Sequence, residues 1–381
     1  MRLPRERREE ICPRTHTKHT KNLKFLFRAF HVFRRQRFNF MKSQLEFFLE
    51  ILSSGVDLTK NEAVEFFMAL QTETENENLI AACLLAFEAK GATTEEVFTM
   101  ANLMRSRAVK VNSKHEIFVD IVGTGGSRAK IFNVSTAAAF VIAGANVPVA
   151  KHGNRAATSQ SGSADVLSAL GVNPSVEAPA AERCLNDIGI CFMFAPKFHA
   201  LSPILGKVRR TLGVPTVFNN LGPLCNPANA PHQIIGVWNE SLLEKTANAL
   251  ARLGTKKSWV VHGSDGLDEI TLSGKTFVAE ISGGKVNRFE ISPADFGLQN
   301  SALTDLQRVS PAGSAKLILE ILNGQSNNET ATNLVLINAA AAIYITGLAA
   351  DLPEALAAAN ESLTSGAAYQ KLQQLIAETN K

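Results

Sequence analysis

The feature that most constrains the fold is a buried strand that runs directly into a glycine-rich loop. Residues 117–122 (IFVDIV) are apolar except for Asp120, and residues 123–126 read GTGG. A continuous apolar run of this length is typical of a strand covered on both faces, as in a parallel sheet. The glycines that follow let the backbone turn tightly and approach a ligand. The segment therefore predicts an α/β sheet with a binding loop at the end of a strand.

Strands and helices alternate after this loop. We predict strands at 147–150, 190–194, 233–237 and 258–262, a helix starting at Ser163, a helix over 241–253, a hairpin over 275–292 that turns at Gly283-Gly284, and two helices at the end of the chain. Such alternation indicates an α/β domain with a central, mostly parallel sheet flanked by helices.

The segment before the first strand has a different pattern. From 41 to about 112 the apolar residues have helical spacing, with helices expected near 62–70 and 76–90 and a third starting at Thr93 or Thr94. The expected fold class is thus α/β, with a small all-helical domain in front of a large α/β domain.

The positive charge of the chain is concentrated at its N-terminus. Residues 1–40 contain twelve Lys and Arg against three Glu, a net of +9, whereas the remaining residues contain 27 Lys and Arg against 32 Asp and Glu, a net of −5. Because the body is mildly acidic, we expect no nucleic-acid partner.

The basic leader itself allows three interpretations. We expect an over-extended reading frame, because Met41 opens the first amphipathic pattern; a disordered basic tail and an organellar transit peptide are the alternatives. Transit peptides are poor in acidic residues, so Glu6, Glu9 and Glu10 speak against the last.

Cysteine usage and hydropathy predict a cytoplasmic protein without a membrane segment. The five cysteines, at 12, 83, 184, 191 and 225, form no CxxC pair and no zinc-ligand spacing, which is typical of reduced thiols. The longest nearly apolar stretch, 334–350, is short and rich in Ala, and therefore predicts a buried helix.

The glycine-rich loop is followed by a helix start that can bind an anion. Residues 133–136 (NVST) precede an apolar helical run, with Ser135 or Thr136 expected as N-cap. Loop N–H groups beside a helix N-terminus favour phosphate or pyrophosphate. The loop matches neither a dinucleotide fingerprint, because Arg128 replaces a required glycine, nor a Walker A loop. Alone, the pattern does not distinguish a phosphate loop from a tight turn.

A second polar loop follows the strand at 147–150. Residues 151–165 (KHGNRAATSQSGSAD) combine cations, hydroxyls, an amide and an imidazole at a strand end, where open α/β sheets bind ligands. Lys151 offers a point charge for phosphate, and Ser159 and Ser163 can donate to its oxygens. A solvated polar loop is the alternative, and His152 taken alone is better explained as a structural hydrogen-bonding residue than as a base.

A pair of adjacent carboxylates, Asp268 and Glu269, follows a third strand and a glycine turn. Neighbouring side chains in an extended segment point in opposite directions, so each can serve a different ion or ligand. Mg²⁺ prefers one or two carboxylates together with waters and substrate phosphates. An isolated Asp-Glu pair beside a turn would by itself be better explained as a solvated surface pair.

Taken together, these loops resemble the anthranilate phosphoribosyltransferase family. The shared motifs are GTGG at 123–126, NVST at 133–136, KHGNR at 151–155, GSAD at 162–165, FAP at 194–196 with His199, Arg209, FNNLGPL at 218–224, GLDE at 266–269 and INAAA at 337–341. The resemblance covers roughly 41–378.

The resemblance implies a transferase that joins anthranilate to phosphoribosyl pyrophosphate with the help of Mg²⁺, two ions being expected, in tryptophan biosynthesis. It also implies a helical domain at 41–115 with a returning stretch at 201–216, a large domain at 116–200 and 217–381, and a homodimer. No membrane partner is expected. No residue is expected to act as a catalytic acid or base.

Carried over by position, the resemblance assigns a role to each matching residue. Phosphoribosyl pyrophosphate would contact Gly123, Gly126, Ser127, Ile131, Asn133, Val134, Ser135, Thr136, Lys151, Ser159 and Ser163. Anthranilate would contact Gly123, His152, Asn154, His199 and Arg209, and the metal would be held by Ser135, Asp268 and Glu269. Lys151, His152 and Asn154 would position the substrates.

Three positions depart from the family pattern. Ser127 stands where Asp is usual, Arg128 where Gly is frequent, and Ile131 where a small hydroxyl residue is frequent. Two rival functions remain: a pyrimidine nucleoside phosphorylase of the same architecture, and a non-catalytic nucleic-acid-binding paralogue. The KHGNR loop with Arg209 favours the anthranilate enzyme over the first, and the acidic body with its carboxylate pair speaks against the second.

Overall fold

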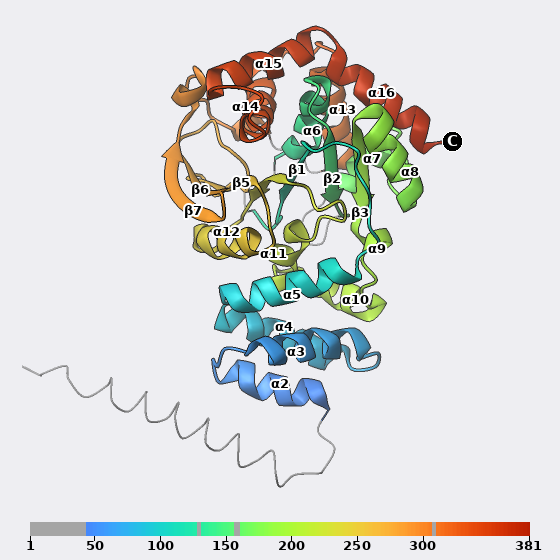
Figure 1. The fold of residues 1–381 in the computed structure, drawn as a ribbon, viewed down its shortest axis with the longest axis vertical. Helices are drawn as coiled ribbons and strands as arrows, with labels where there is room; N and C mark the ends of the chain where they lie inside the picture. The colour runs from blue at the N-terminus through green and yellow to red at the C-terminus, as the bar shows by residue number, and fades with distance from the viewer. Residues whose placement is uncertain (1–42, 128–130, 156–160, 307–309) are drawn as a thin grey trace, which may run out of the picture. The chain divides into compact units, whose positions relative to one another are not determined.

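The computed structural model describes residues 43–127, 131–155, 161–306 and 310–381 (Figure 1). The basic leader at 1–40, Arg128 and Ser159 lie outside these residues, so the expectations for them stay predictions.

Four helices form the small helical domain at the start of the described chain: α2 (Gln44–Ser53), α3 (Lys60–Thr72), α4 (Glu77–Lys90) and α5 (Thr94–Arg107). Capping boxes start two of them, because the hydroxyls of Thr59 and Thr93 accept hydrogen bonds from backbone N–H groups three residues on. The predicted cap at Thr93 is thus confirmed. Phenylalanines fill the space between the helices, with the rings of Phe66 and Phe87 stacked at 5.6 Å.

The large domain is built on a seven-stranded sheet, counted over the described residues, in the order β3-β2-β1-β4-β5-β6-β7. The strands are β1 (Val119–Gly123), β2 (Val149–Gly153), β3 (Ile190–Phe194), β4 (His232–Gly236), β5 (Lys257–Gly263), β6 (Thr276–Ser282) and β7 (Lys285–Ile291). The first five are parallel, and β6 and β7 form the predicted antiparallel hairpin. Val119 of β1 pairs with Val149 on one side and His232 on the other.

Two hydrophobic cores lie on the two faces of this sheet, and the strand pleat separates them. In β4, Ile234 belongs to one core and its neighbour Ile235 to the other. The first core is covered by α6 (Val134–Gly144), α13 (Pro311–Leu322), α14 (Glu329–Ile345), α15 (Leu352–Thr364) and α16 (Ala367–Thr379), as Figure 1 shows above the sheet. The second is shared by α11 (Val217–Leu224), α12 (Leu243–Arg252) and the helical domain.

The remaining elements complete the described chain. They are α7 (Ser163–Ala169), α8 (Ala178–Arg183) running into a π-helical turn at Cys184–Ile188, α9 (Ala195–Phe198), α10 (Pro203–Leu212), and 3₁₀ turns at Glu240–Leu242, Pro293–Phe296 and Thr304–Leu306. Helix α10 packs on α4 of the helical domain although it lies between β3 and β4 in the sequence.

Helix α5 joins the two domains. Its Arg105 donates from Nε to the carbonyl of Leu224 at 2.6 Å and from Nη1 to the carbonyl of Leu253 at 3.2 Å. These carbonyls end α11 and α12, so one cation fixes the helical domain to both helices on this face of the sheet.

Two details differ from the sequence prediction. Residues 310–381 form four helices, whereas the sequence predicted two. Gly347 and Gly366 adopt positive φ and interrupt helices that the Ala-rich sequence suggests are continuous. Helix α6 begins at Val134 with Asn133 as N-cap, so neither Ser135 nor Thr136 caps it. Among the described residues, no helix combines the length and apolar character that a membrane span needs.

Candidate active site

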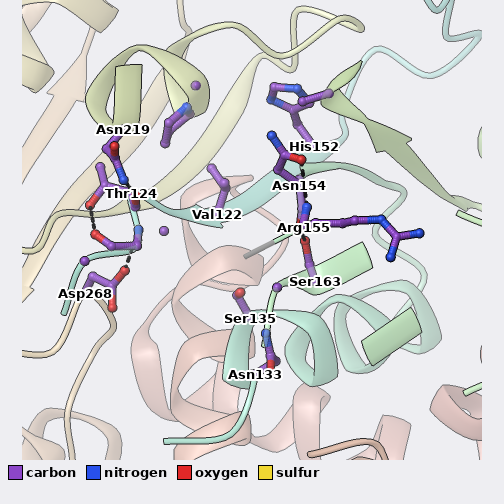
Figure 2. Close-up of a pocket in the computed structure, with 18 of the residues that line it drawn as sticks. Val122, Thr124, Asn133, Ser135, His152, Asn154, Arg155, Ser163, Asn219 and Asp268 are labelled. Carbon is purple, nitrogen blue, oxygen red and sulfur yellow. Dashed lines mark hydrogen bonds between the residues drawn. The ribbon is translucent and has the colours of Figure 1, made fainter. Parts of the chain in front are cut away.

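The C-terminal ends of β1, β2 and β5 meet around one cavity of about 290 Å³ (Figure 2). The cavity lies where the sheet order reverses, because the chain places β2 on one side of β1 and β4 on the other. Open α/β sheets bind ligands at such a point. In Figure 2, Thr124, Asn219 and Asp268 lie on one side of the cavity, and His152, Asn154 and Ser163 lie on the other.

Neighbouring loops hold the glycine-rich loop open. The Thr124 amide donates to the carbonyl of Gly236 at 2.8 Å, and the Asn219 side chain donates to the carbonyl of Thr124 at 3.2 Å. Gly125 and Gly126 then adopt φ of +64° and +86°, a conformation that other residues rarely take. The backbone therefore turns tightly at these glycines, as the sequence predicted.

The start of α6 faces the same cavity. The Ser135 amide donates to Glu269 Oε1 at 3.3 Å, so a carboxylate already lies at this helix N-terminus. Thr136, predicted as a contact for phosphoribosyl pyrophosphate, is fully buried within α6 and does not line the cavity.

A buried cation lies beneath these loops. Lys151 is 4% exposed and donates to the carbonyl of Ile121 at 2.6 Å, and its Nζ lies 3.4 Å from Ser135 Oγ. Burial lowers the pKa of Lys151, whereas the carboxylates of Asp120 and Glu269 act in the opposite direction. These two carboxylates favour the charged ammonium that a phosphate would need.

The acidic pair turns toward two different loops. Asp268 Oδ2 accepts a hydrogen bond from the Gly125 amide at 3.0 Å, and Glu269 accepts the one from Ser135. Burial, and then the charge of Asp268, raises the pKa of Glu269 to about 8, while burial raises the pKa of Asp268. A cation between them would relieve this cost, because it favours both ionised forms.

The oxygen donors around the pair suit Mg²⁺. Two carboxylates and the Ser135 hydroxyl line one cavity, and hard oxygen ligands of this kind are those that Mg²⁺ prefers. No cluster of three or more His, Cys, Asp or Glu side chains suited to a metal occurs in the part of the chain that the structure describes. A metal here would therefore need further oxygens from a substrate or water.

Two histidines and an arginine also line the cavity. The rings of His152 and His199 meet edge to face, with centroids 5.0 Å apart, and neither ring nitrogen of His199 has a hydrogen-bond partner. Burial lowers the pKa of His199 to about 4 and that of His152 well below its usual value, so both rings are neutral near pH 7.

Arg209 projects from α10 over the ring of Phe218, with its guanidinium carbon 5.1 Å from the ring centroid. Burial lowers its pKa to about 10, which leaves the side chain a cation at neutral pH. No carboxylate of the described residues lies within salt-bridge distance, and Nε has no hydrogen-bond partner. The guanidinium is thus available for an anionic ligand.

Nearly all of the residues predicted for the site come together. Those that line the cavity are Gly123, Gly126, Ser127, Ile131, Asn133, Val134, Ser135, Lys151, His152, Asn154, Ser163, His199, Arg209, Asp268 and Glu269. Thr136 does not, and Ser159 lies outside the described residues.

Some residues that line the cavity were not predicted as site residues from the sequence. Met104 of α5, Leu201 and Phe218 also line the cavity. Asn219 could have been singled out, because it belongs to the FNNLGPL motif, but Met104 comes from the helical domain and only the packing of α5 brings it here.

The fold and the cavity define a glycosyl transferase. Residues 48–108 match the model of the helical bundle domain of a glycosyl transferase family, and residues 115–369 match the model of its α/β domain. An anthranilate phosphoribosyltransferase of Clostridium kluyveri is 42% identical over 331 residues, which are 87% of this chain and 98% of that protein. The chain belongs to the anthranilate phosphoribosyltransferase family.

Solved structures agree with this assignment. The crystal structure of the enzyme from Thermus thermophilus superposes with a TM-score of 0.80 at 36% identity, over 88% of this chain and 99% of that one. The enzyme from Saccharomyces cerevisiae, in complex with phosphoribosyl pyrophosphate and Mg, gives 0.81 at 28% identity, over 89% and 99%.

Proposed function

We propose that this protein transfers the phosphoribosyl group of phosphoribosyl pyrophosphate to the amine of anthranilate, which releases pyrophosphate and supplies tryptophan biosynthesis. The observation that supports this most directly is that one cavity is lined by two sets of groups. One set comprises a glycine-rich loop, a helix N-terminus, a buried lysine and two carboxylates, and the other comprises a cation without a carboxylate partner and two neutral imidazoles.

The first set suits phosphoribosyl pyrophosphate. The glycine-rich loop and the N-terminus of α6 line the cavity, and Lys151 adds a positive charge that attracts phosphate oxygens. Asn133 and Ser163 offer further polar groups to the same cavity. Asp268, Glu269 and Ser135 would hold Mg²⁺, two ions being proposed, and Mg²⁺ bound there would neutralise charge on the departing pyrophosphate.

The second set suits anthranilate. The guanidinium of Arg209 can bind a carboxylate through two parallel N–H donors. His152, His199 and Asn154 line the same cavity, and they can orient the amine by hydrogen bonds. Met104 and Phe218 supply apolar surface for an aromatic ring.

The proposed reaction needs no strong base. The aromatic amine carries an available lone pair at neutral pH, so it can attack the ribosyl carbon as the bond to pyrophosphate breaks, and the proton that the amine loses can pass to the released pyrophosphate. The chain's contribution is to align the amine, to stabilise the developing negative charge with Lys151, and to exclude water. Ser135 lies beside Lys151 and Glu269, but its proposed role is to hold Mg²⁺, so we propose direct transfer without a covalent intermediate.

We further propose the domain limits predicted from the sequence, with a helical domain at 41–115 and 201–216, and pairing of two copies through that domain. The packing of α10 on α4 supports the inclusion of the returning stretch.

The reaction can be tested by the fluorescence of anthranilate, which should fall only when protein, phosphoribosyl pyrophosphate and Mg²⁺ are all present. The double variant Asp268→Asn/Glu269→Gln should lose the signal. No loss by folded wild-type protein, beside a working family member, would overturn the proposal and favour the phosphorylase alternative.

A further inference from the structure

A buried asparagine on α14 contacts the segment that carries the acidic pair. Asn338 is fully buried, and its Oδ1 accepts a hydrogen bond from the Ile270 amide at 2.9 Å. Its Nδ2 donates to the carbonyl of Ile270, also at 2.9 Å. One side chain therefore satisfies both backbone groups of the residue that directly follows Glu269.

These two backbone groups would otherwise lack partners. Ile270 lies in the irregular segment between β5 and β6, and its side chain is 1% exposed, so neither the sheet nor open solvent surrounds it. Buried backbone N–H and C=O groups are almost always paired, because an unpaired one is costly. The segment thus takes its position from a helix that lies 68 residues away in the sequence.

The same segment is fixed again on the other side of the acidic pair. Asp268 accepts the bond from Gly125, and its carbonyl oxygen lies against Gly236 so closely that a β-carbon there would stand 1.7 Å away. The ends of β1 and β4 therefore contact the acidic pair at Asp268, and Asn338 fixes the residue that follows Glu269.

Asn338 is itself held rigidly. Its Nδ2 also donates to the carbonyl of Leu334, one turn earlier in α14, at 2.9 Å. This bond fixes the amide orientation, since Nδ2 faces two carbonyls and Oδ1 faces one N–H. The helix around it packs on β4 and β5 through Ala and Ile side chains, so the asparagine is a polar group in an apolar face.

We infer that Asn338 is a positioning residue for the metal-binding carboxylates, acting on Glu269 through the backbone of Ile270. The expected effect of Asn338 on Mg²⁺ binding rests on the proposed function. Its expected effect on the position of the segment around Glu269 and Ile270 does not. Partners one layer behind metal ligands typically change metal affinity by about 10–100-fold when they are lost.

The test compares three variants with the wild-type protein. Asn338→Ala removes the contact and keeps a good helix former. Asn338→Asp keeps an acceptor for the Ile270 amide but loses both N–H donors, and it serves if the alanine variant does not fold. Ile343→Ala truncates another buried side chain of α14 and is the control for general destabilisation.

Amide hydrogen exchange of the metal-free proteins is measured first, on peptides that cover 264–275. We expect about tenfold faster exchange there in the Asn338 variants and no selective change in Ile343→Ala. With substrates, the half-saturating Mg²⁺ concentration should rise about tenfold in the Asn338 variants alone. Exchange and Mg²⁺ dependence that match those of Ile343→Ala would overturn the inference. If wild-type protein shows no transfer, the proposed function fails, and the exchange measurement still decides the role of Asn338.

Discussion

The Ser127 hydroxyl donates to the carbonyl oxygen of Gly266 at 3.0 Å and so joins the glycine-rich loop to the loop of the acidic pair. An aspartate, the usual residue of the family at this position, cannot donate this bond. The serine thus replaces a negative charge near the proposed metal with a direct contact between two of the loops that surround the cavity.

Ser127→Asp should therefore change the Mg²⁺ dependence of the rate. The variant loses a hydrogen bond worth about 1 kcal/mol and gains a charge close to Asp268 and Glu269. Ser127→Ala is the control, because it loses the bond without adding the charge. Rates measured over a range of Mg²⁺ concentrations check this, and identical curves for all three proteins would show that position 127 has no influence on the metal.

Arg209→Ala should weaken the binding of anthranilate far more than that of phosphoribosyl pyrophosphate. The Arg209 side chain is partly buried and has no carboxylate partner among the described residues, so a substrate carboxylate would be its main ionic contact. Loss of one member of a desolvated charge pair predicts a rise of about 10²-fold in the KM for anthranilate.

The exposed neighbour Arg210 lies on the same helix and offers the matched control. Steady-state kinetics of Arg210→Ala should stay close to those of the wild type. Equal losses for the two substrates in Arg209→Ala would contradict the assignment of this residue to the carboxylate.

The buried His199 should make the protein less stable in acid. In the unfolded chain this imidazole takes up a proton near pH 6.5, whereas burial lowers its pKa to about 4 in the folded protein. Between these values the unfolded state binds more protons, so the free energy of unfolding decreases as the pH falls from 6.5 to 4.

His199→Gln should remove this contribution, which is on the order of 3 kcal/mol over that interval. Urea unfolding at pH 7, 5.5 and 4 gives the free energy of unfolding of each protein. The pH dependence of the difference between the two proteins is the contribution of His199. Asp120, whose pKa burial raises to about 6, changes stability in the opposite sense in both proteins and cancels in the comparison. Parallel pH curves would contradict a neutral, buried His199.

The sequence predicted best those features that depend on neighbouring residues. The apolar run at 190–194 predicts a buried strand, and it forms β3. Local patterns of polar residues and glycines likewise predict the two loops and the acidic pair. Parallel strands then bring their C-terminal ends to one edge, which is why separate motifs form one cavity.

Features set by distant contacts could not be predicted. The motif at 337–341 was noticed, but nothing local indicates that Asn338 bonds to Ile270. Thr136 was assigned to the site through the NVST motif, but it lies within α6, and its side chain is fully buried and does not line the cavity. A motif therefore does not show which of its side chains face the site.

At Gly236, β4 ends against the acidic segment. A β-carbon at this position would stand 1.7 Å from the carbonyl oxygen of Asp268. Gly236 is paired with Gly123 on one side and Val261 on the other, so the strand cannot move away and the acidic segment has to shift. Gly236→Ala should lower the free energy of unfolding by about 1–3 kcal/mol and raise the half-saturating Mg²⁺ concentration.

Gly206→Ala on α10 is the matched substitution, because its added β-carbon meets only the end of the flexible Arg210 side chain, at an ordinary 3.5 Å. It should leave Mg²⁺ dependence unchanged and raise stability by about 0.5–1 kcal/mol, the usual gain when alanine replaces glycine within a helix. Urea unfolding and Mg²⁺ titration of both variants separate the two effects. A Gly236→Ala protein with wild-type stability and wild-type Mg²⁺ dependence would mean that the acidic segment has room to move, and that its close contact with β4 does not fix the carboxylates.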